Sequence, residues 1–416
     1  MARRYVIVGA SLAGATAAIT LREDGADGTV TLIGAEHESP YERPPLSKAY
    51  LRGDLPFDKA LVRPPVFYAE HGIDTMFGTR VTRIDPSACE VELEDRRRVP
   101  FDALLIATGG RNRHLSMPGG DLDGIYGLRT VQDADRIRQE MIAGRRVVVV
   151  GMGFIGSEVA ASLRLKGLEV VAIDPSKTPL FRALGETVGQ TLADLHRSHG
   201  VRTIFGETVA AFEGTGRVNC VVTKGGLRLE CDFVVVGIGI EPVVDALAGS
   251  GIHVDNGVVV DEYCQTNISG IYAAGDVANH YHPVFNRRIR VEHWHNAIKQ
   301  GAAAARNMQG KRVAYDDVHW FWSDQYDTSL QYAGYHTTWE QLVVRGRIGS
   351  GSYLACYVND GRVDAVVGLN RGKDVRRVMP LIKSRRAVDL DQLRDEGVDI
   401  RAVRTIPSVQ VREEPT

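Results

Sequence analysis

A repeat spaced by 142 residues constrains this chain of 416 residues more than any other feature of its sequence. Each copy has a strand rich in β-branched residues, a glycine turn, a helix of small residues and a second strand. The matching positions are Gly9, Gly14, Ala18, Leu21 and Gly25 in the first copy and Gly151, Gly156, Ala160, Leu163 and Gly167 in the second. Two such βαβ units predict an α/β fold with two Rossmann-like dinucleotide-binding domains.

Both turns have the pattern of a pyrophosphate-binding loop. Residues 151–156 form a complete GxGxxG, whereas residues 9–14 have Ser11 at the middle position. Glycines there permit a tight turn, backbone approach to a pyrophosphate and close helix packing, and the helix N-terminus attracts the phosphates. For a single copy, the alternative is a turn that serves only strand-helix packing, and the second copy disfavours it. The predicted nucleotide contacts are Gly9, Ser11, Gly14, Gly151, Gly153, Phe154, Ile155 and Gly156.

An acid at the end of the second strand of each unit indicates which nucleotide binds. Asp174 stands 18 residues after Gly156, where a carboxylate accepts hydrogen bonds from the adenosine ribose and repels a 2′-phosphate. This position favours NADH over NADPH, although Lys177 nearby offers a charge for a 2′-phosphate. In the first unit the candidate is Glu36, and a neighbouring acid is the alternative.

Charge and cysteine content exclude several classes of protein. Fifty basic and 52 acidic residues give a net charge of -2, so no overall field attracts nucleic acid. The cysteines are Cys89, Cys220, Cys231, Cys264 and Cys356. Their spacing contains no CxxC pair, which argues against a disulfide scaffold and a zinc site. The apolar stretch after Arg4 resembles a signal peptide but fits the first strand, turn and helix better, so we expect a cytoplasmic protein that does not enter a membrane.

Later motifs add a resemblance to a known family. Apolar strands followed by small-residue turns occupy residues 102–110, 233–242 and 266–276. Further distinctive segments are residues 40–48, 128–130, 291–294 and 320–325. With these motifs, the chain resembles the flavoprotein reductases that have two dinucleotide-binding domains. More narrowly, it is similar to the NADH-dependent ferredoxin reductases of cytochrome P450 and Rieske oxygenase systems, with apoptosis-inducing factor as a further relative.

The resemblance implies FAD and NADH as cofactors and assigns residues to them. Arg43, Lys48 and Arg129 are expected to neutralise the pyrophosphate and polarise the flavin, and Asp276 to accept a ribityl hydroxyl. A solvated surface charge is the alternative for each basic residue; the stiff diproline next to Arg43 and Lys48 disfavours it. The remaining implied contacts are Ala107, Thr108, Gly109, Trp294 and Gly239.

Three residues are implied at the reacting centre. Lys48 is expected to tune the flavin near N5, Glu158 to approach the nicotinamide pocket, and Trp322 to pack near the flavin ring. The alternatives stay open: an acid near a helix N-terminus is stabilising by itself, and Trp294 and Trp322 can be ordinary core residues.

The early part of the chain lacks the thiols that related disulfide reductases place next to the flavin. Residues 44–47 read Pro-Pro-Leu-Ser, and no cysteine precedes Cys89. Electrons are therefore expected to leave the flavin directly for an external one-electron carrier.

A small acidic [2Fe-2S] ferredoxin is the expected partner, and it needs a basic surface. Residues 340–386 carry ten basic and four acidic residues, with a solvated surface as the alternative. Other acceptors remain open, namely rubredoxin, a quinone or oxygen, as does a role like that of apoptosis-inducing factor as an NADH-responsive interaction protein. His280, His282, His293 and His295 are expected in the core or at a pocket rim, with no metal.

The predicted layout has three domains. Residues 1–110 and 245–317 form the FAD-binding domain, and residues 111–244 form the NAD-binding domain. Residues 318–407 form a C-terminal α+β domain of antiparallel strands and two helices, followed by a flexible tail at 408–416.

Overall fold

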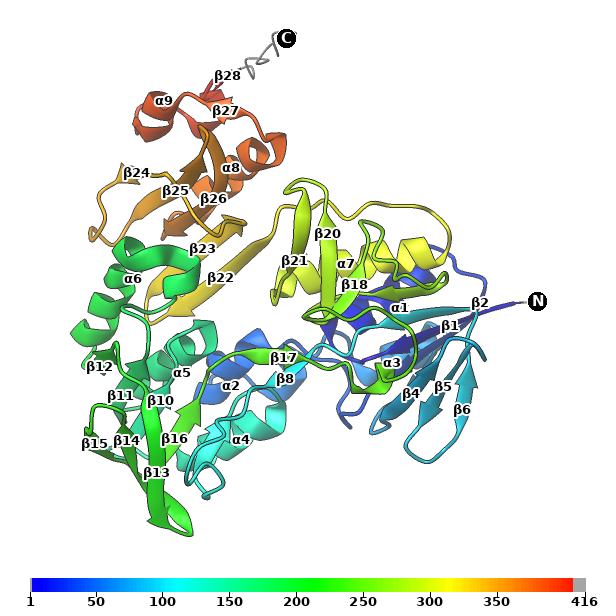
Figure 1. Cartoon of the computed structure of the whole chain (residues 1–416), viewed down its shortest axis with the longest axis horizontal. Coiled ribbons are helices and arrows are strands. Elements are labelled where there is room, and N and C mark those ends of the chain that lie inside the picture. The colour runs from blue at the N-terminus through cyan, green and yellow to red at the C-terminus, as the bar shows by residue number, and fades with distance from the viewer. Residues whose placement is uncertain (1, 407–416) are drawn as a thin grey trace, which may run out of the picture. The chain divides into compact units, whose positions relative to one another are not determined.

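The computed structural model describes residues 2–406, which form two compact units (Figure 1). Within these residues, unit 1 comprises 2–176 and 199–316, and unit 2 comprises 177–198 and 317–406. The predicted tail at 408–416 lies outside the described residues, and the three domain boundaries stay a prediction. No helix within residues 2–406 is long and apolar enough to cross a membrane.

The first sheet of unit 1 is parallel, with the strand order β19-β7-β1-β2-β3. Its strands are β1 (Arg3–Val8), β2 (Gly28–Ile33), β3 (Ile73–Met76), β7 (Ala103–Ile106) and β19 (Ile271–Ala273). Helices α1 (Leu12–Glu23) and α7 (Trp294–Met308) pack against each other beside it. Tyr5 and Ile7 face the core that contains these helices, whereas Val6 and Val8 face a second core. Burial on both faces explains why the strand is apolar throughout.

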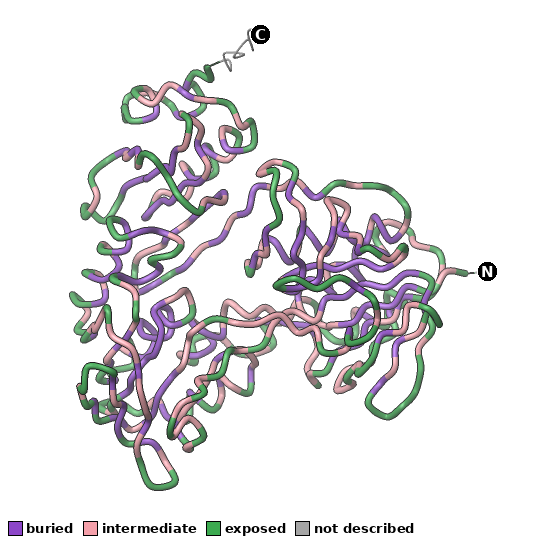
Figure 2. Tube along the Cα trace, in the orientation of Figure 1, coloured by how far each residue is buried: buried purple, intermediate pink, exposed green. Residues whose placement is uncertain are grey.

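The second sheet of unit 1 repeats this arrangement, with the parallel order β12-β11-β10-β16-β9. Its strands are β9 (Ile125–Gly127), β10 (Arg146–Val150), β11 (Glu169–Asp174), β12 (Arg202–Phe205) and β16 (Phe233–Val236). Helices α4 (Val131–Glu140) and α5 (Phe154–Leu165) accompany it. The central strands of both sheets are buried, as Figure 2 shows. The two predicted βαβ units are therefore β1-α1-β2 and β10-α5-β11.

Close backbone packing at the turns explains the repeated glycines. A Cβ atom on Gly14 would lie 1.9 Å from the carbonyl oxygen of Gly9, and one on Gly156 would lie 1.8 Å from that of Gly151. Gly9 and Gly151 also have positive φ angles of 115° and 93°. Glycine is the residue that meets these two demands without strain.

Smaller elements complete unit 1. They are β4 (Val81–Asp85), β5 (Glu90–Leu93) and β6 (Arg98–Pro100); β13 (Val209–Thr215), β14 (Arg217–Thr223) and β15 (Arg228–Glu230); β18 (Val258–Val260), β20 (Ala278–His282) and β21 (Arg287–Arg290); the pair β8 (Gly110–Asn112) and β17 (Ile240–Pro242); helices α2 (Ala49–Arg52) and α3 (Pro65–Glu70); and 3-10 turns η1 (Pro44–Ser47), η2 (Phe57–Ala60) and η3 (Asp245–Leu247). The antiparallel pair β8-β17 lies where the chain passes from the first sheet to the second and back.

Unit 2 is built on an antiparallel sheet, as its alternating sequence predicts. Its strands are β22 (Trp320–Gln325), β23 (Thr328–Gly334), β26 (Arg362–Leu369), β25 (Tyr353–Asn359) and β24 (Gln341–Gly346), extended by β27 (Ala387–Val388) and β28 (Thr405–Ile406), with α8 (Gly372–Ser384), α9 (Leu390–Arg394) and η4 (Ile400–Ala402). Helix α6 (Phe181–Ser198) belongs to this unit, since the Tyr357 hydroxyl donates to the Leu184 carbonyl at 2.8 Å. The kink of α6 at Gly185 lies against the Trp339 ring.

A buried arginine holds the C-terminal helices to the sheet of unit 2. The Arg345 side chain is 3% exposed and donates to the carbonyl groups of Gln392, Leu393 and Val398 at 3.3, 2.8 and 2.7 Å. Arg345 is one of the ten basic residues counted in 340–386, and it contributes nothing to an exposed basic surface.

Replacing Arg345→Leu is expected to lower the free energy of unfolding by about 3 kcal/mol, because the substitution leaves these buried carbonyl groups without their donor. Urea unfolding followed by circular dichroism measures the change. Arg347→Ala, at an exposed position just after the same strand, is the control and should stay within about 0.5 kcal/mol of the wild type. Equal stability of the two variants would contradict the role of Arg345.

Candidate functional site

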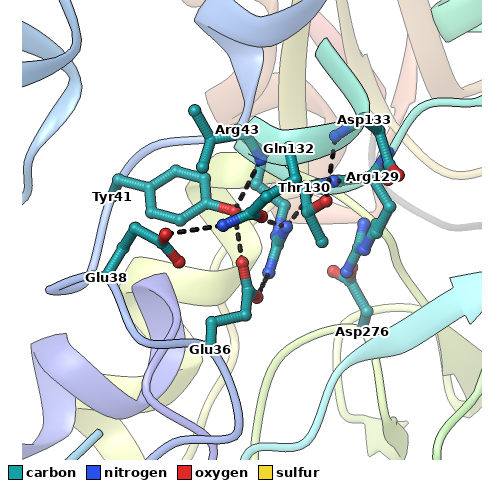
Figure 3. A network of polar contacts seen from close by, with 10 residues as sticks. Glu36, Glu38, Tyr41, Arg43, Arg129, Thr130, Gln132, Asp133 and Asp276 are labelled. Atoms are coloured by element: carbon teal, nitrogen blue, oxygen red, sulfur yellow. Dashed lines mark hydrogen bonds and ion pairs between the residues drawn. The ribbon is translucent and has the colours of Figure 1, made fainter. Parts of the chain in front are cut away.

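A polar network lies where β2 ends and α4 begins (Figure 3). The Glu36 carboxylate pairs with the Arg43 guanidinium at 2.6 Å and accepts a hydrogen bond from the Tyr41 hydroxyl. Arg43 also donates to the Arg129 carbonyl, and the Tyr41 hydroxyl accepts from the Val131 backbone N–H at 3.1 Å. These contacts tie the diproline segment to both elements, and they bring together Glu36, Arg43 and Arg129, three of the predicted FAD contacts.

The charged groups of this network stabilise one another in their ionised forms. Burial raises the pKa of Glu36, but the nearby Arg43 charge and the hydrogen bonds from Tyr41 and Arg43 outweigh burial, so the net shift is downward. Burial lowers the pKa of Arg43, and Glu36 more than offsets that effect. Burial raises the pKa of Tyr41, which therefore remains a protonated donor. Glu36 is thus ionised and able to accept ribose hydroxyls, beside an arginine able to bind phosphate.

Arg129 and Asp276 meet although they are 147 residues apart in the chain. Their side chains pair at 2.8 Å, with both residues largely buried. Asp276 follows β19 and Gly275, whose N–H donates to the Gln300 side chain on α7 at 2.8 Å. The Arg129 backbone N–H donates to Asp133, which also forms a capping box with Thr130 at the start of α4. The predicted flavin contacts Arg129 and Asp276 therefore have fixed positions.

The middle position of the second glycine turn, unlike the first and last positions, is not constrained by packing within the protein. A Cβ atom on Gly153 would meet no atom within 4 Å, and its φ of -71° suits any residue. Packing within the protein therefore does not require this glycine, whereas approach of a pyrophosphate to the backbone does. Ser11 occupies the equivalent position before α1, and its side chain makes no capping hydrogen bond to the helix. Both turns fit the phosphates of a dinucleotide at a helix N-terminus.

Asp174, the predicted ribose acceptor, lies beside the second glycine turn. Its carboxylate accepts hydrogen bonds from the backbone N–H groups of Met152 at 2.6 Å and Ser176 at 2.7 Å. These bonds fix the orientation of the carboxylate at the position expected for an adenosine ribose. Lys177, the charge that weakened the preference for NADH, pairs with Glu186 at 2.9 Å within unit 2. Glu186 therefore offsets part of the lysine charge.

The expected reacting centre contains a buried ion pair. Lys48 Nζ lies 2.7 Å from Glu158 Oε2, and their side chains are 14% and 4% exposed. The Ser47 hydroxyl donates to the same Glu158 oxygen. Because Lys48 follows η1 and Glu158 lies on α5, this contact joins the predicted FAD-binding and NAD-binding parts of unit 1. Glu158 thus does more than interact with a helix dipole.

The remaining predicted contacts surround these features. Gly9 packs on the Ala107 carbonyl, the Thr108 hydroxyl donates to the Val243 carbonyl at 2.6 Å, and Gly109 and Gly239 have positive φ angles of 66° and 94°.

Aromatic side chains lie at the start of α7. The Phe154 ring meets the His293 ring edge-on, with centroids 6.4 Å apart. Burial lowers the pKa of His293 to about 4, so its ring is neutral at pH 7. Trp294 starts α7 and packs against the core that contains α1 and α7.

Trp322 lies on β22 of unit 2. Its ring stacks on that of Trp320 with centroids 5.4 Å apart, and its role near the flavin stays a prediction.

Sequence reasoning missed three residues of this site. Tyr41 and Ser47 lie within the diproline motif, so their position next to Arg43 and Lys48 was an available signal. Gln300 gave none, because its contact with Gly275 depends on how α7 packs. His280 and His282 lie outside the network, buried on β20 next to the Tyr315 ring.

The geometry defines a class: an oxidoreductase that binds FAD and a nicotinamide nucleotide at two parallel-sheet domains. Residues 3–301 match the pyridine nucleotide-disulphide oxidoreductase family and residues 320–404 match the reductase C-terminal family. The chain belongs to the pyridine nucleotide-disulphide oxidoreductase family, and the predicted α/β fold and the resemblance to its ferredoxin reductases are confirmed. This family uses FAD and NAD(H), as predicted.

Individual relatives match over nearly their whole length. The chain is 37% identical over 398 residues to rhodocoxin reductase of Rhodococcus erythropolis, covering 95% of this chain and 93% of the relative. It is 39% identical over 401 residues to the ferredoxin-NAD(+) reductase component of the anthranilate 1,2-dioxygenase system of Burkholderia cepacia, covering 95% and 98%. A chain in the crystal structure of the covalent putidaredoxin reductase-putidaredoxin complex matches with a TM-score of 0.93 and 35% identity, covering 96% and 97%.

Lys48→Met removes the ammonium group at nearly constant side-chain length. We expect the reduction of bound FAD by NADH to slow roughly tenfold, because a fixed positive charge no longer stabilises the reduced flavin. Anaerobic stopped-flow absorbance on FAD-saturated protein measures the rate. Lys59→Met, at an exposed position, is the control that should leave the rate unchanged. An unchanged rate in Lys48→Met would rule out this role.

Asp174→Asn keeps an oxygen acceptor for the turn but removes the charge that repels a 2′-phosphate. The ratio of kcat/KM for NADH to that for NADPH is expected to fall about tenfold. Steady-state assays with both nucleotides and a dye acceptor measure it. Asp194→Asn, an exposed acid on α6, is the matched control. A ratio that stays constant in Asp174→Asn would show that Asp174 does not select the nucleotide.

Proposed function

We propose that this protein is an FAD-containing reductase that takes hydride from NADH and passes single electrons to a small [2Fe-2S] ferredoxin, which serves a cytochrome P450 or a Rieske oxygenase. The observation that carries the proposal is the buried Lys48–Glu158 pair, which joins the diproline segment to the helix after the second glycine turn and has Ser47 beside it. Bound FAD supplies the chemistry that accepts a hydride and releases electrons one at a time.

The chain's own residues bind and orient the reactants. The two helix N-termini after Gly9 and Gly151 hold the pyrophosphates, while Glu36 and Asp174 accept hydrogen bonds from the riboses. Lys48 supplies a fixed positive charge next to the flavin, and the Glu158 carboxylate keeps that ammonium group in place. These residues would hold the nucleotide and the flavin next to each other, so that the two would not have to meet by random encounter.

Electron transfer through a protein thiol is disfavoured. The segment next to the ion pair carries Ser47, and the five cysteines are free. Burial raises the pKa of Cys231 and of Cys356 to about 12, so neither forms a reactive thiolate at neutral pH. Free cysteines also fit a reducing compartment, and we place the protein in the cytoplasm.

The partner is proposed to dock on basic residues within 340–386. Lys373 and Arg376 are exposed one turn apart on α8, whereas Arg371 pairs with Asp374 and Arg385 pairs with Asp364. Exposed basic side chains on one helix face complement an acidic protein surface. The relatives named as components of dioxygenase systems, and the structural neighbour bound to putidaredoxin, support a ferredoxin in this role.

Turnover with an acidic [2Fe-2S] ferredoxin should therefore decrease steeply as NaCl rises from about 50 to 500 mM, because salt screens the attraction between the proteins. Turnover with a small neutral dye should stay constant over the same range. The double substitution Lys373→Glu and Arg376→Glu should raise KM for ferredoxin at low salt without changing dye reduction. Fast reduction of a quinone or of oxygen, together with no ferredoxin activity, would contradict the proposed acceptor.

A further inference from the structure

Ser47 contacts α5 through both its hydroxyl and its carbonyl group. The hydroxyl donates to Glu158 Oε2, the oxygen that Lys48 Nζ also binds at 2.7 Å. The carbonyl accepts a hydrogen bond from the Ser162 hydroxyl at 2.7 Å. Glu158 and Ser162 are four residues apart on the helix, so both contacts lie on the same helix face. Ser47 therefore fixes the end of η1 against the helix that follows the second glycine turn.

These contacts are shielded from water. Ser47 is 1% exposed, Glu158 4% and Ser162 1%. Water therefore cannot replace a hydrogen bond that the buried carboxylate loses. The Ser47 hydroxyl has a single proton and also lies 3.3 Å from the Pro44 carbonyl. An ionised acceptor binds a proton more strongly than a neutral carbonyl does, so the proton points to Glu158.

A second donor on the Glu158 oxygen has a consequence for Lys48. A lysine side chain is flexible and its ammonium group carries three rotatable donors, so the ion pair with Lys48 does not by itself set the orientation of the carboxylate. The Ser47 donor is carried by a short side chain on a backbone segment that Ser162 holds, and it adds a directional contact to the same oxygen. The Lys48 ammonium group then has one defined position.

We propose that Ser47 is a positioning residue for hydride transfer. Its hydroxyl orients the Glu158 carboxylate, and the carboxylate in turn holds the Lys48 ammonium group where the reduced flavin needs a positive charge. This inference rests on the proposed function, in which Lys48 acts on the flavin.

Ser47→Ala in the FAD-loaded protein removes the hydroxyl and keeps the carbonyl contact with Ser162. In anaerobic stopped-flow, the limiting rate of FAD reduction should fall roughly three- to tenfold, while the Kd for NADH from the same data changes less than twofold. Thr223→Val removes a buried hydroxyl on β14 and should leave both quantities unchanged. A limiting rate equal to that of the wild type overturns the proposal.

A double-mutant cycle with Glu158→Gln provides a readout that does not depend on activity. If Ser47 acts through Glu158, Ser47→Ala shifts the urea midpoint of unfolding less in the Glu158→Gln background than in the wild type. Additive shifts overturn the proposal. If Ser47→Ala does not retain FAD, Ser47→Cys is used instead, because it keeps a weaker donor of similar size. The limiting rate of FAD reduction in Ser47→Cys should then fall less than in Glu158→Gln. A loss of rate as large as that in Glu158→Gln overturns the proposal.

The two claims fail in different ways. A wild-type protein whose FAD is not reduced by NADH contradicts the proposed function, and the unfolding cycle still tests whether Ser47 and Glu158 are coupled. A wild-type protein that is reduced rapidly, with a Ser47→Ala variant that is reduced equally fast, contradicts only the role of Ser47.

Discussion

The carbonyl oxygen of the first glycine in each turn occupies the space where a side chain on the last glycine of that turn would stand. The separations would be 1.9 Å at Gly14 and 1.8 Å at Gly156, and neither leaves room for a methyl group. This contact sets how closely each helix approaches its strand, and so where the helix N-terminus points. Both phosphate-binding positions, and the acids that follow the neighbouring strands, depend on it.

Charged groups around these turns are buried in pairs. Glu36 pairs with Arg43 seven residues along the chain, whereas the pairs Arg129–Asp276 and Lys48–Glu158 join segments 147 and 110 residues apart. Removing such charges from water costs about as much as their attraction returns, so these pairs contribute little to stability. They instead fix the position of each charge, which a site for electron transfer requires.

The sequence predicted the parts of the site that local geometry determines. Glycine spacing identifies the two turns, and an acid at a strand end identifies a ribose position, because both depend on residues close in the chain. The diproline motif marked the position of Ser47 but not its contact with Glu158, and Gln300 escaped prediction altogether, because Glu158 and Gly275 become their neighbours only through packing of distant elements. Arg345 was counted as a surface charge because charge clustering contains no information about burial. The role of Trp322 near the flavin also stays a prediction.

The central claim is that electrons pass from NADH to FAD and leave the flavin with no protein thiol between them. Anaerobic titration of the FAD-loaded protein with NADH, followed by flavin absorbance, tests this claim most directly. Complete bleaching at about one equivalent of NADH per FAD is predicted, because the flavin alone takes up two electrons. Complete reduction only at about two equivalents would reveal a second two-electron centre such as a dithiol, and would contradict the account.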